Sequence, residues 1–250
     1  MKLIIKAIQF IYSIYAFVVF VAIMFLMLPV ILVASAFGIK GGNFLYRVCG
    51  AWAGLWYLFI FVKHKEIYEF SHDKNKQYIF VANHISYMDI PPLVLAIHQP
   101  FRALGKYEMI KVPVFGWIYK AAVILVDRRD SETRARSVRA LKAAVAKGIS
   151  IFIFPEGTFN ATKKPLKSFY DGAFRIAIET QTPIKPLLFI DTLKRLHYNN
   201  LFSLTTGLNR VIYLAEVSVD GLTMNDLPIL KQQVFDIMEA GLKRYDAHFS

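Results

Sequence analysis

The feature that most restricts the fold of this chain is an unbroken run of 33 uncharged residues, positions 7–39. As a single α-helix the run would be about 50 Å long, whereas about 20 residues are enough to cross the core of a bilayer. Pro29 lies inside the run and would kink or break a helix there. The run therefore predicts a bent apolar segment that enters a membrane.

A second uncharged run, residues 48–62, has 15 residues and is short for a membrane span. It is rich in aromatic residues, which prefer the headgroup level of a bilayer. A cleaved signal peptide is disfavoured, because the first run is too long and no clear cleavage site follows it. A single span followed by an interfacial helix stays open beside a membrane-embedded hairpin of two helices.

The charges around the two runs favour the hairpin. Basic residues lie both before and after the first run, at Lys2, Lys6, Lys40, Arg47, Lys63 and Lys65. Because basic residues favour the cytoplasmic side of a membrane, positive charge at both ends suits a segment that enters and returns. This pattern predicts attachment to the inner (cytoplasmic) membrane, with the rest of the chain on the cytoplasmic side.

The composition of the whole chain agrees with a membrane partner. Its 250 residues include 30 Lys and Arg against 18 Asp and Glu, a net charge of +12, and 56% of them are hydrophobic. Disordered chains lack so many apolar residues, so disorder is excluded. The excess charge suits nucleic acid or an anionic membrane surface, and the apolar content favours the membrane.

The charges are unevenly distributed along the chain. Residues 1–63 contain no acidic residue, which predicts membrane-binding helices over 1–63 and a second domain over 64–250. Residues 102–175 contain 15 basic and 6 acidic residues. An excess of this size could attract an anionic substrate or an anionic surface.

Residues 64–250 alternate short β-branched runs with longer polar segments. This alternation predicts an α/β fold with a mixed, largely parallel sheet flanked by helices. The predicted strands cover residues 78–82, 101–104, 122–126, 150–154, 184–189 and 211–219. A helix is expected over 131–147, capped by Ser131 and ended by Gly148, and an amphipathic helix is expected over 226–245.

Polar side chains follow the first of these strands. Residues 83–89 read NHISYMD and place a candidate general base, His84, five positions before a carboxylate, Asp89. Asp89 could orient the imidazole and stabilise its protonated form. Because residues five apart on one helix point about 140° apart, the two side chains meet only if His84 lies in the turn before a helix that holds Asp89. The alternative is an unrelated loop histidine and helix N-terminal aspartate.

Three further strand ends carry candidate ligand-binding residues. Residues 154–158 read FPEGT, in which Gly157 lets the backbone approach a ligand and Glu156 could bind substrate hydroxyls or fix the loop. Residues 126–129 read VDRR, whose arginines suit a phosphate or carboxylate, and Lys106 follows another strand. A turn that closes a strand and a solvated arginine pair are the alternatives without a function.

Together these motifs resemble those of the PlsC-like glycerolipid acyltransferases, a family typified by 1-acylglycerol-3-phosphate acyltransferases. NHISYMD resembles the family's H-x4-D motif, VDR its second block, and FPEGT its E-G-T block. Residues 182–186 (TPIKP) resemble its fourth, proline-containing block, and the ordered blocks cover roughly residues 64–220. Val126 and Lys185 depart from the family's usual residues, which concerns substrate preference more than the type of reaction.

The resemblance implies an O-acyltransferase that makes phosphatidic acid in phospholipid biosynthesis. His84 would deprotonate the free hydroxyl of 1-acyl-sn-glycerol-3-phosphate, with Asp89 orienting the ring. The alkoxide would then attack an acyl thioester, taken from acyl-CoA or acyl carrier protein. The substrate phosphate is assigned to Arg128. Further substrate contacts are expected from Lys106, Glu156, Gly157 and Thr158, with the Gly157 N–H as oxyanion donor.

The lack of a nucleophile motif and of a metal-ligand set in the sequence agrees with this mechanism. No G-x-S-x-G motif is present, and the single cysteine, Cys49, lies in an apolar segment, so no enzyme nucleophile is evident. No metal or cofactor is expected, since no Cys/His ligand set is present. Nucleic acid is not expected as a partner, because no basic-aromatic groove or basic recognition helix stands out.

Two other functions stay open. The chain could acylate a lyso-aminolipid such as lyso-ornithine lipid, whose carboxylate Arg128 could also bind. Alternatively, it could be a catalytically inactive membrane-binding homologue, although the intact motif residues His84, Asp89, Glu156 and Gly157 argue against this.

Overall fold

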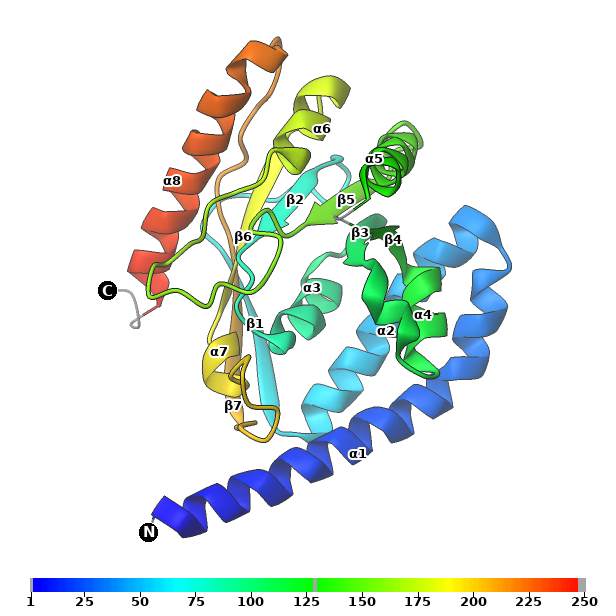
Figure 1. The fold of residues 1–250 in the computed structure, drawn as a ribbon, viewed down its shortest axis with the longest axis vertical. Helices are drawn as coiled ribbons and strands as arrows, with labels where there is room; N and C mark the ends of the chain where they lie inside the picture. The colour runs from blue at the N-terminus through cyan, green and yellow to red at the C-terminus, as the bar shows by residue number, and fades with distance from the viewer. Residues whose placement is uncertain (1, 128–129, 247–250) are drawn as a thin grey trace.

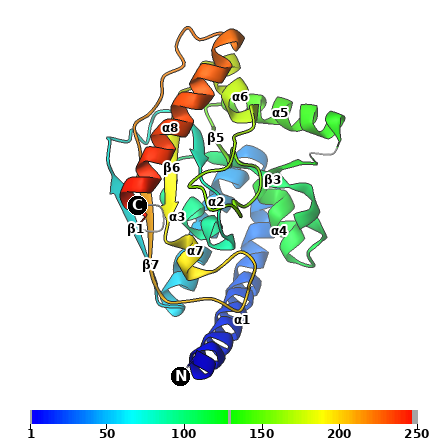
Figure 2. The same ribbon diagram turned by 60° about the vertical axis from the view of Figure 1, so that its left-hand side comes forward.

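Within residues 2–127 and 130–246, which a computed structural model describes, the chain forms a seven-stranded sheet with helices on both faces (Figures 1 and 2). Its strands are β1 Val62–Tyr68, β2 Ile79–Ala82, β3 Phe101–Lys106, β4 Val123–Val126, β5 Ser150–Ile153, β6 Ile184–Ile190 and β7 Gly207–Tyr213. Its α-helices are α1 Lys2–Ser35, α2 Gly38–Phe59, α3 Ile90–Ala96, α4 Phe115–Ala122, α5 Ser131–Val145, α6 Gly172–Thr180, α7 Thr192–Arg195 and α8 Leu227–Tyr245. Short 3₁₀ helices include η1 Tyr87–Asp89 and η2 Tyr107–Lys111.

The strands are ordered β1-β7-β6-β2-β5-β3-β4 across the sheet. Strands β2 to β6 all run in one direction, whereas β7 pairs antiparallel with β6, and β1 pairs parallel with β7. The predicted mixed, largely parallel sheet flanked by helices is therefore confirmed. Because β2 to β5 point the same way, the residues that follow them emerge at one edge of the sheet, where ligands bind in folds of this class.

The central strand β2 is buried on both faces, because helices cover both sides of the sheet. Ile79 and Val81 belong to the apolar core that includes side chains of α5, α6 and α8. Phe80 and Ala82 point the other way and belong to the core shared with α3 and α2. This alternation explains why the strand reads as a continuous apolar run in the sequence.

Helices α1 and α2 form an antiparallel hairpin beside the sheet (Figure 1). The indole N–H groups of Trp52 and Trp56 donate to the carbonyl oxygens of Phe20 and Ala16, at 3.2 and 2.8 Å. The helix α1 continues through Pro29 without breaking, and its axis bends along its length (Figure 1). The boundary expected at residue 63 falls one residue inside β1.

The outer surface of α1 is apolar. Residues Ile4–Ser35 are long and apolar enough to cross a membrane, with a mean hydropathy of 3.1 in a window of which only 22% is buried. Leu26, for example, is 69% exposed, whereas Ile31 on the inner side is fully buried. A helix in the core of a soluble domain would be mostly buried, so the exposed apolar face of α1 distinguishes it from such a helix.

Several predicted elements differ from those observed. Strand β1 is absent from the predicted strands, because its central residues Lys63 to Glu66 are charged or polar, as an edge strand permits. The last strand, expected over 211–219, is β7 at Gly207–Tyr213, and Val217 makes only an isolated bridge to Ile184. The cap of α5 is Asp130 and not Ser131, since the Asp130 carboxylate accepts the N–H groups of Glu132 and Thr133.

Candidate active site

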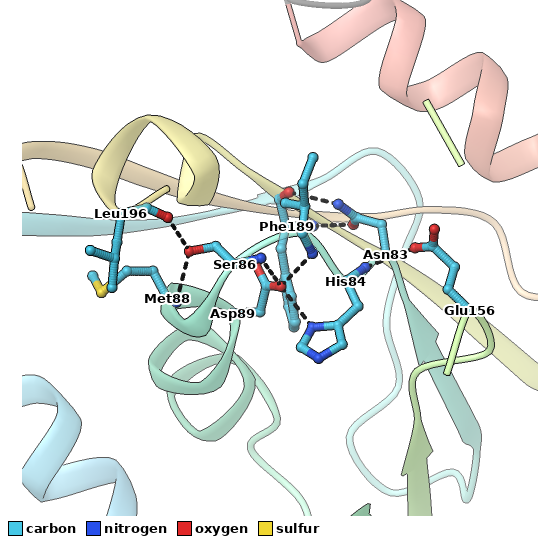
Figure 3. A network of polar contacts seen from close by, with 9 residues as sticks. Asn83, His84, Ser86, Met88, Asp89, Glu156, Phe189 and Leu196 are labelled. Carbon is cyan, nitrogen blue, oxygen red and sulfur yellow. Dashed lines mark hydrogen bonds and ion pairs between the residues drawn. The ribbon is translucent and has the colours of Figure 1, made fainter. Parts of the chain in front are cut away.

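His84 and Asp89 lie together at the end of β2. The Asp89 Oδ2 atom lies 2.8 Å from His84 Nδ1 (Figure 3). Strand β2 ends at Ala82, His84 lies in the following turn, and Asp89 is the last residue of η1. This is the arrangement under which residues five apart can meet. The bond to Asp89 occupies Nδ1 and leaves Nε2 on the opposite side of the ring, so the pair has the geometry of a base and its orienting acid.

Backbone donors fix the position of the Asp89 carboxylate. Its Oδ2 atom also accepts the N–H groups of Ile85 and Ser86, at 2.7 and 2.9 Å. The Ser86 hydroxyl in turn accepts the Met88 N–H at 3.0 Å and donates to the Leu196 carbonyl at 2.6 Å (Figure 3). Asp89 is fully buried. The Ser86-x-x-Asp89 spacing is a capping box, a signal in the sequence that could have located this turn.

Glu156 holds the backbone of His84. Its two oxygens accept the N–H groups of His84 and Lys167, each at 2.8 Å. The Glu156 side chain is fully buried, and this burial raises its pKa to about 7, against the two backbone N–H groups, which lower it. Of the two roles open for Glu156, these contacts favour fixing the loop over binding substrate hydroxyls.

The FPEGT segment is a tight turn after β5. Gly157 has a φ of +77°, which a residue with a Cβ rarely adopts. Its N–H donates to the Phe154 carbonyl at 3.1 Å. The turn itself uses this hydrogen, and the role of the Gly157 N–H as oxyanion donor stays a prediction. The exposed Thr158 accepts a hydrogen bond from Lys167 Nζ at 2.8 Å.

Two aromatic rings enclose the imidazole. The Phe154 ring stacks on His84 with centroids 3.9 Å apart and planes 13° apart, and Phe159 meets it edge-on at 4.4 Å. The carbonyl of His84 accepts the N–H of the buried Asn160 at 2.7 Å. The loop after β5 thus fixes both backbone polar groups of His84, since the Glu156 carboxylate accepts its N–H and the Asn160 N–H donates to its carbonyl.

The other predicted site residues come from neighbouring strand ends. Lys106 ends β3 at the same edge as His84; its side chain is 70% exposed and lies 3.8 Å from Glu108. Arg128 follows β4 in the sequence but lies outside the described residues. In residues 2–127 and 130–246, no group of three or more His, Cys, Asp or Glu side chains could hold a metal ion.

The fourth motif block lies at the amino-terminal end of the parallel strands, opposite to the end that carries His84. Lys185 is paired in register with Phe80, four positions before His84, near the start of β6. It is fully buried, and its Nζ donates to the Ser71 carbonyl at 3.0 Å. Burial lowers the pKa of Lys185. Its departure from the family's usual residue therefore concerns packing of the sheet and not the surroundings of His84.

One residue in the first motif has a role that sequence reasoning did not assign. The Asn83 amide donates to the Phe189 carbonyl at 3.0 Å and accepts the Phe189 N–H at 2.8 Å (Figure 3). These two bonds continue the pairing of β2 with β6 by one more residue. They fix the position at which the chain leaves the sheet, immediately before His84.

Comparison with known proteins places these motifs in one family. The sequence profile of the Acyltransferase family matches residues 61–190, more than half of the chain. The chain belongs to the acyltransferase family. The matched range of this acyltransferase contains His84, Asp89 and Glu156, and it excludes α1 and α8.

Named relatives and one solved structure resemble this acyltransferase. A chloroplast 1-acyl-sn-glycerol-3-phosphate acyltransferase of Brassica napus is 33% identical over 115 residues, 46% of this chain and 33% of that protein. A protein of the same activity from Salmonella typhimurium is 29% identical over 67% of this chain and 68% of its own. The chain thus matches about a third of the length of the chloroplast relatives.

The solved structure supports the fold over the whole chain. The crystal structure of PlsC, the 1-acyl-sn-glycerophosphate acyltransferase of Thermotoga maritima, has a TM-score of 0.74 to this acyltransferase at 22% identity. The match covers 98% of this chain and 97% of that one. The similarity therefore extends beyond the family profile to the N-terminal helices α1 and α2.

Proposed function

We propose that this acyltransferase transfers an acyl chain from an acyl thioester to the free hydroxyl of 1-acyl-sn-glycerol-3-phosphate, making phosphatidic acid. The His84–Asp89 pair carries the proposal. Among the described residues, no serine or threonine hydroxyl and no thiol hydrogen-bonds to the His84 ring. A base without its own nucleophile suits a substrate that brings the hydroxyl. Several relatives bear the name of this activity.

The proposed reaction needs one proton carrier. His84 Nε2 takes the proton of the lysolipid hydroxyl while its oxygen attacks the thioester carbonyl carbon. Asp89 stabilises the imidazolium that forms, because its carboxylate already lies against Nδ1. When the tetrahedral intermediate collapses, the carbon–sulfur bond breaks, the ester remains on the lipid, and the imidazolium returns its proton to the thiolate.

The acceptor phosphate is assigned to Lys106, which ends β3, and to Arg128, which follows β4 in the sequence. Arg128 would offer a planar pair of donors for a phosphate, and the exposed Lys106 would add a positive charge. Glu156 acts in this scheme by holding the His84 backbone. Gly157 shapes the turn, and Thr158 with Lys167 lines its exposed side.

Membrane attachment through residues 1–63 would bring the enzyme to its lipid substrate. The exposed apolar surface of α1 supports this, because lipid tails would cover it. The acyl donor, acyl-CoA or acyl carrier protein, would arrive from the aqueous side. The basic residues at both ends of the first apolar run support placement on the cytoplasmic side of the inner membrane.

The lyso-aminolipid alternative is not favoured. The unusual Lys185, which leaves room for this alternative in the sequence, lies at the far end of the sheet with its charge directed to the Ser71 carbonyl. The inactive-homologue alternative requires a damaged site, whereas His84 and Asp89 are in bonding contact.

An acceptor-by-donor matrix tests the proposal with the full chain in mixed detergent–lipid micelles. Lysophosphatidate and lyso-ornithine lipid are the acceptors, and acyl-CoA and acyl carrier protein carry the acyl group. We expect transfer to lysophosphatidate, lowered by about a thousandfold or more in His84→Ala. His98→Ala is the matched control, because His98 pairs with Glu66 away from the site. Preference for the lyso-ornithine acceptor, or full activity of His84→Ala, would contradict the proposal.

A further inference from the structure

The two oxygens of Asp89 are used unequally. Oδ2 accepts hydrogen bonds from His84 Nδ1 and from the N–H groups of Ile85 and Ser86. Oδ1 is buried, and among the described residues no group hydrogen-bonds to it. An ionised oxygen taken out of water without a donor costs free energy, so the fold should provide a donor near it.

A tyrosine of the N-terminal hairpin packs in the buried cluster that flanks the Asp89 turn. Tyr57 of α2 is 3% exposed and belongs to the same buried apolar cluster as Met88 and Leu196, which flank the Asp89 turn. Its phenol is close enough to the Asp89 carboxylate for the two groups to interact electrostatically. Tyr57 is thus a neutral hydroxyl donor from a helix outside the sheet.

The phenol oxygen is itself held in place from β7. Asn209 is fully buried, and its Nδ2 donates to Tyr57 Oη at 2.7 Å. A phenol can accept one hydrogen bond and donate another. Because Asn209 uses the oxygen as an acceptor, the phenol hydrogen remains for a second partner.

Glu156 is a second group near enough to interact with Asp89, but other contacts already hold both of its oxygens. They accept the N–H groups of His84 and Lys167. Tyr57, whose phenol oxygen accepts from Asn209, is therefore the candidate donor for Oδ1.

We propose that Tyr57, held by Asn209, is a positioning residue of the acyl-transfer site and donates its phenol hydrogen to Asp89 Oδ1 through one water. The inference rests on the proposed role of His84 as the base. It assigns α2 a part in the chemistry besides its place in the apolar hairpin.

The sign of the expected effect follows from the charge on Asp89. Without the phenol hydrogen, the carboxylate has one donor fewer and attracts the proton on His84 more strongly. The imidazole then stays protonated to a higher pH, where it cannot act as a base. Loss of the donor should therefore move the acid limb of the pH–rate profile upward.

The kcat/KM of Tyr57→Phe against pH tests the proposal. We expect the midpoint of its acid limb to rise by about half to one pH unit, and that of Asn209→Ala by less, in the same direction. Tyr46→Phe is the matched control, because Tyr46 is also buried on α2 but bonds to the backbone of Ala103 and Ala122. A midpoint in Tyr57→Phe equal to that of the wild type and Tyr46→Phe would overturn the proposal.

A second measurement does not depend on turnover. The proton between His84 Nδ1 and Asp89 Oδ2 gives an NMR resonance whose position should change in Tyr57→Phe and Asn209→Ala and not in Tyr46→Phe. An unchanged resonance in both would overturn the inference even where Tyr57→Phe folds poorly, since Asn209→Ala reports separately. Activity of His84→Ala would instead refute the proposed function, while the resonance would still report the Tyr57–Asp89 contact.

Discussion

The turn after β2 and the outer face of α1 differ in the interactions that they make. In the turn, hydrogen bonds from backbone and side-chain groups hold His84 in one orientation. On α1, large apolar side chains such as Leu26 and Phe17 point outward over more than half of their surface. The first region depends on the positions of single atoms. The second depends on apolar area, which many side chains supply interchangeably.

The two regions should therefore differ in the substitutions that they tolerate. A carboxylate that accepts three hydrogen bonds cannot be replaced by a neutral group of the same shape without losing at least one of them. An exposed leucine among many exposed apolar residues can be replaced with little effect on folding. The following substitutions test the contrast, beginning with the largest expected effect.

Asp89→Asn keeps the size of the side chain and removes its charge. The amide cannot accept the three hydrogen bonds of Oδ2 and also stabilise a protonated His84. We expect kcat/KM to fall by about 10² to 10⁴ with lysophosphatidate as acceptor. Asp171→Asn, at an exposed carboxylate paired with Lys231, serves as the control. If both variants lose activity equally, Asp89 has no special part in the reaction.

Glu156→Gln tests the loop that holds His84. Glutamine offers one oxygen in place of two, so one of the two N–H groups loses its acceptor. At pH 8 we expect kcat/KM to fall by about tenfold, the equivalent of one hydrogen bond to a charged group. Wild-type activity at that pH would show that the reaction does not need both contacts.

The same variant changes how stability depends on pH. Since burial raises the pKa of Glu156 to about 7, the folded chain binds a proton that the unfolded chain releases between about pH 4.5 and 7. The stability that this residue contributes therefore decreases as pH rises through that window. We expect the Tm of the wild type relative to Glu156→Gln to be higher at pH 5 than at pH 8. A constant or opposite difference would contradict the raised pKa.

A pair of substitutions on α1 tests the other region and should have the smallest effects on catalysis. Ile31→Ala removes a fully buried side chain from the contact with α2 and should lower the free energy of unfolding in detergent by about 2–4 kcal/mol. Leu26→Ala, at a 69% exposed position, should leave that free energy unchanged within about 0.5 kcal/mol.

Binding to vesicles should be affected more by Leu26→Ala than by Ile31→Ala, the reverse of their effects on the free energy of unfolding. With anionic phosphatidylglycerol–phosphatidylethanolamine vesicles, Leu26→Ala should bind a few-fold more weakly, because it removes apolar area from the lipid-facing surface. Equal vesicle binding by Leu26→Ala and the wild type would place the outer face of α1 away from lipid.

The parts of the fold that the sequence predicts are those with local signals. Strand β2 reads as an apolar run because both of its faces are covered, and the polar residues after it mark the edge that holds the site. The His84–Asp89 spacing required a turn before a short helix, and η1 follows that turn. The strands whose carboxyl ends meet at one edge could be expected from their parallel order alone.

The parts that escaped prediction depend on contacts between distant segments. Strand β1 carries charges and is recognisable only through its pairing with β7. In the sequence Glu156 suits a substrate ligand as well as a loop contact, and only the folded chain shows that it accepts the N–H groups of His84 and Lys167. Tyr57 and Asn209 lie 152 positions apart and meet only in the folded chain. No local pattern specifies such pairs.

The pairing of β1 with β7 also sets an order for synthesis. Val62 pairs with Gly207, so β1 has no strand partner until 145 further residues have left the ribosome. Helices α1 and α2 pack on each other, and their residues are synthesised long before that. Under the proposed membrane attachment, the apolar hairpin would reach the bilayer while the sheet is still being made, and the sheet would close its edge on a chain that is already anchored.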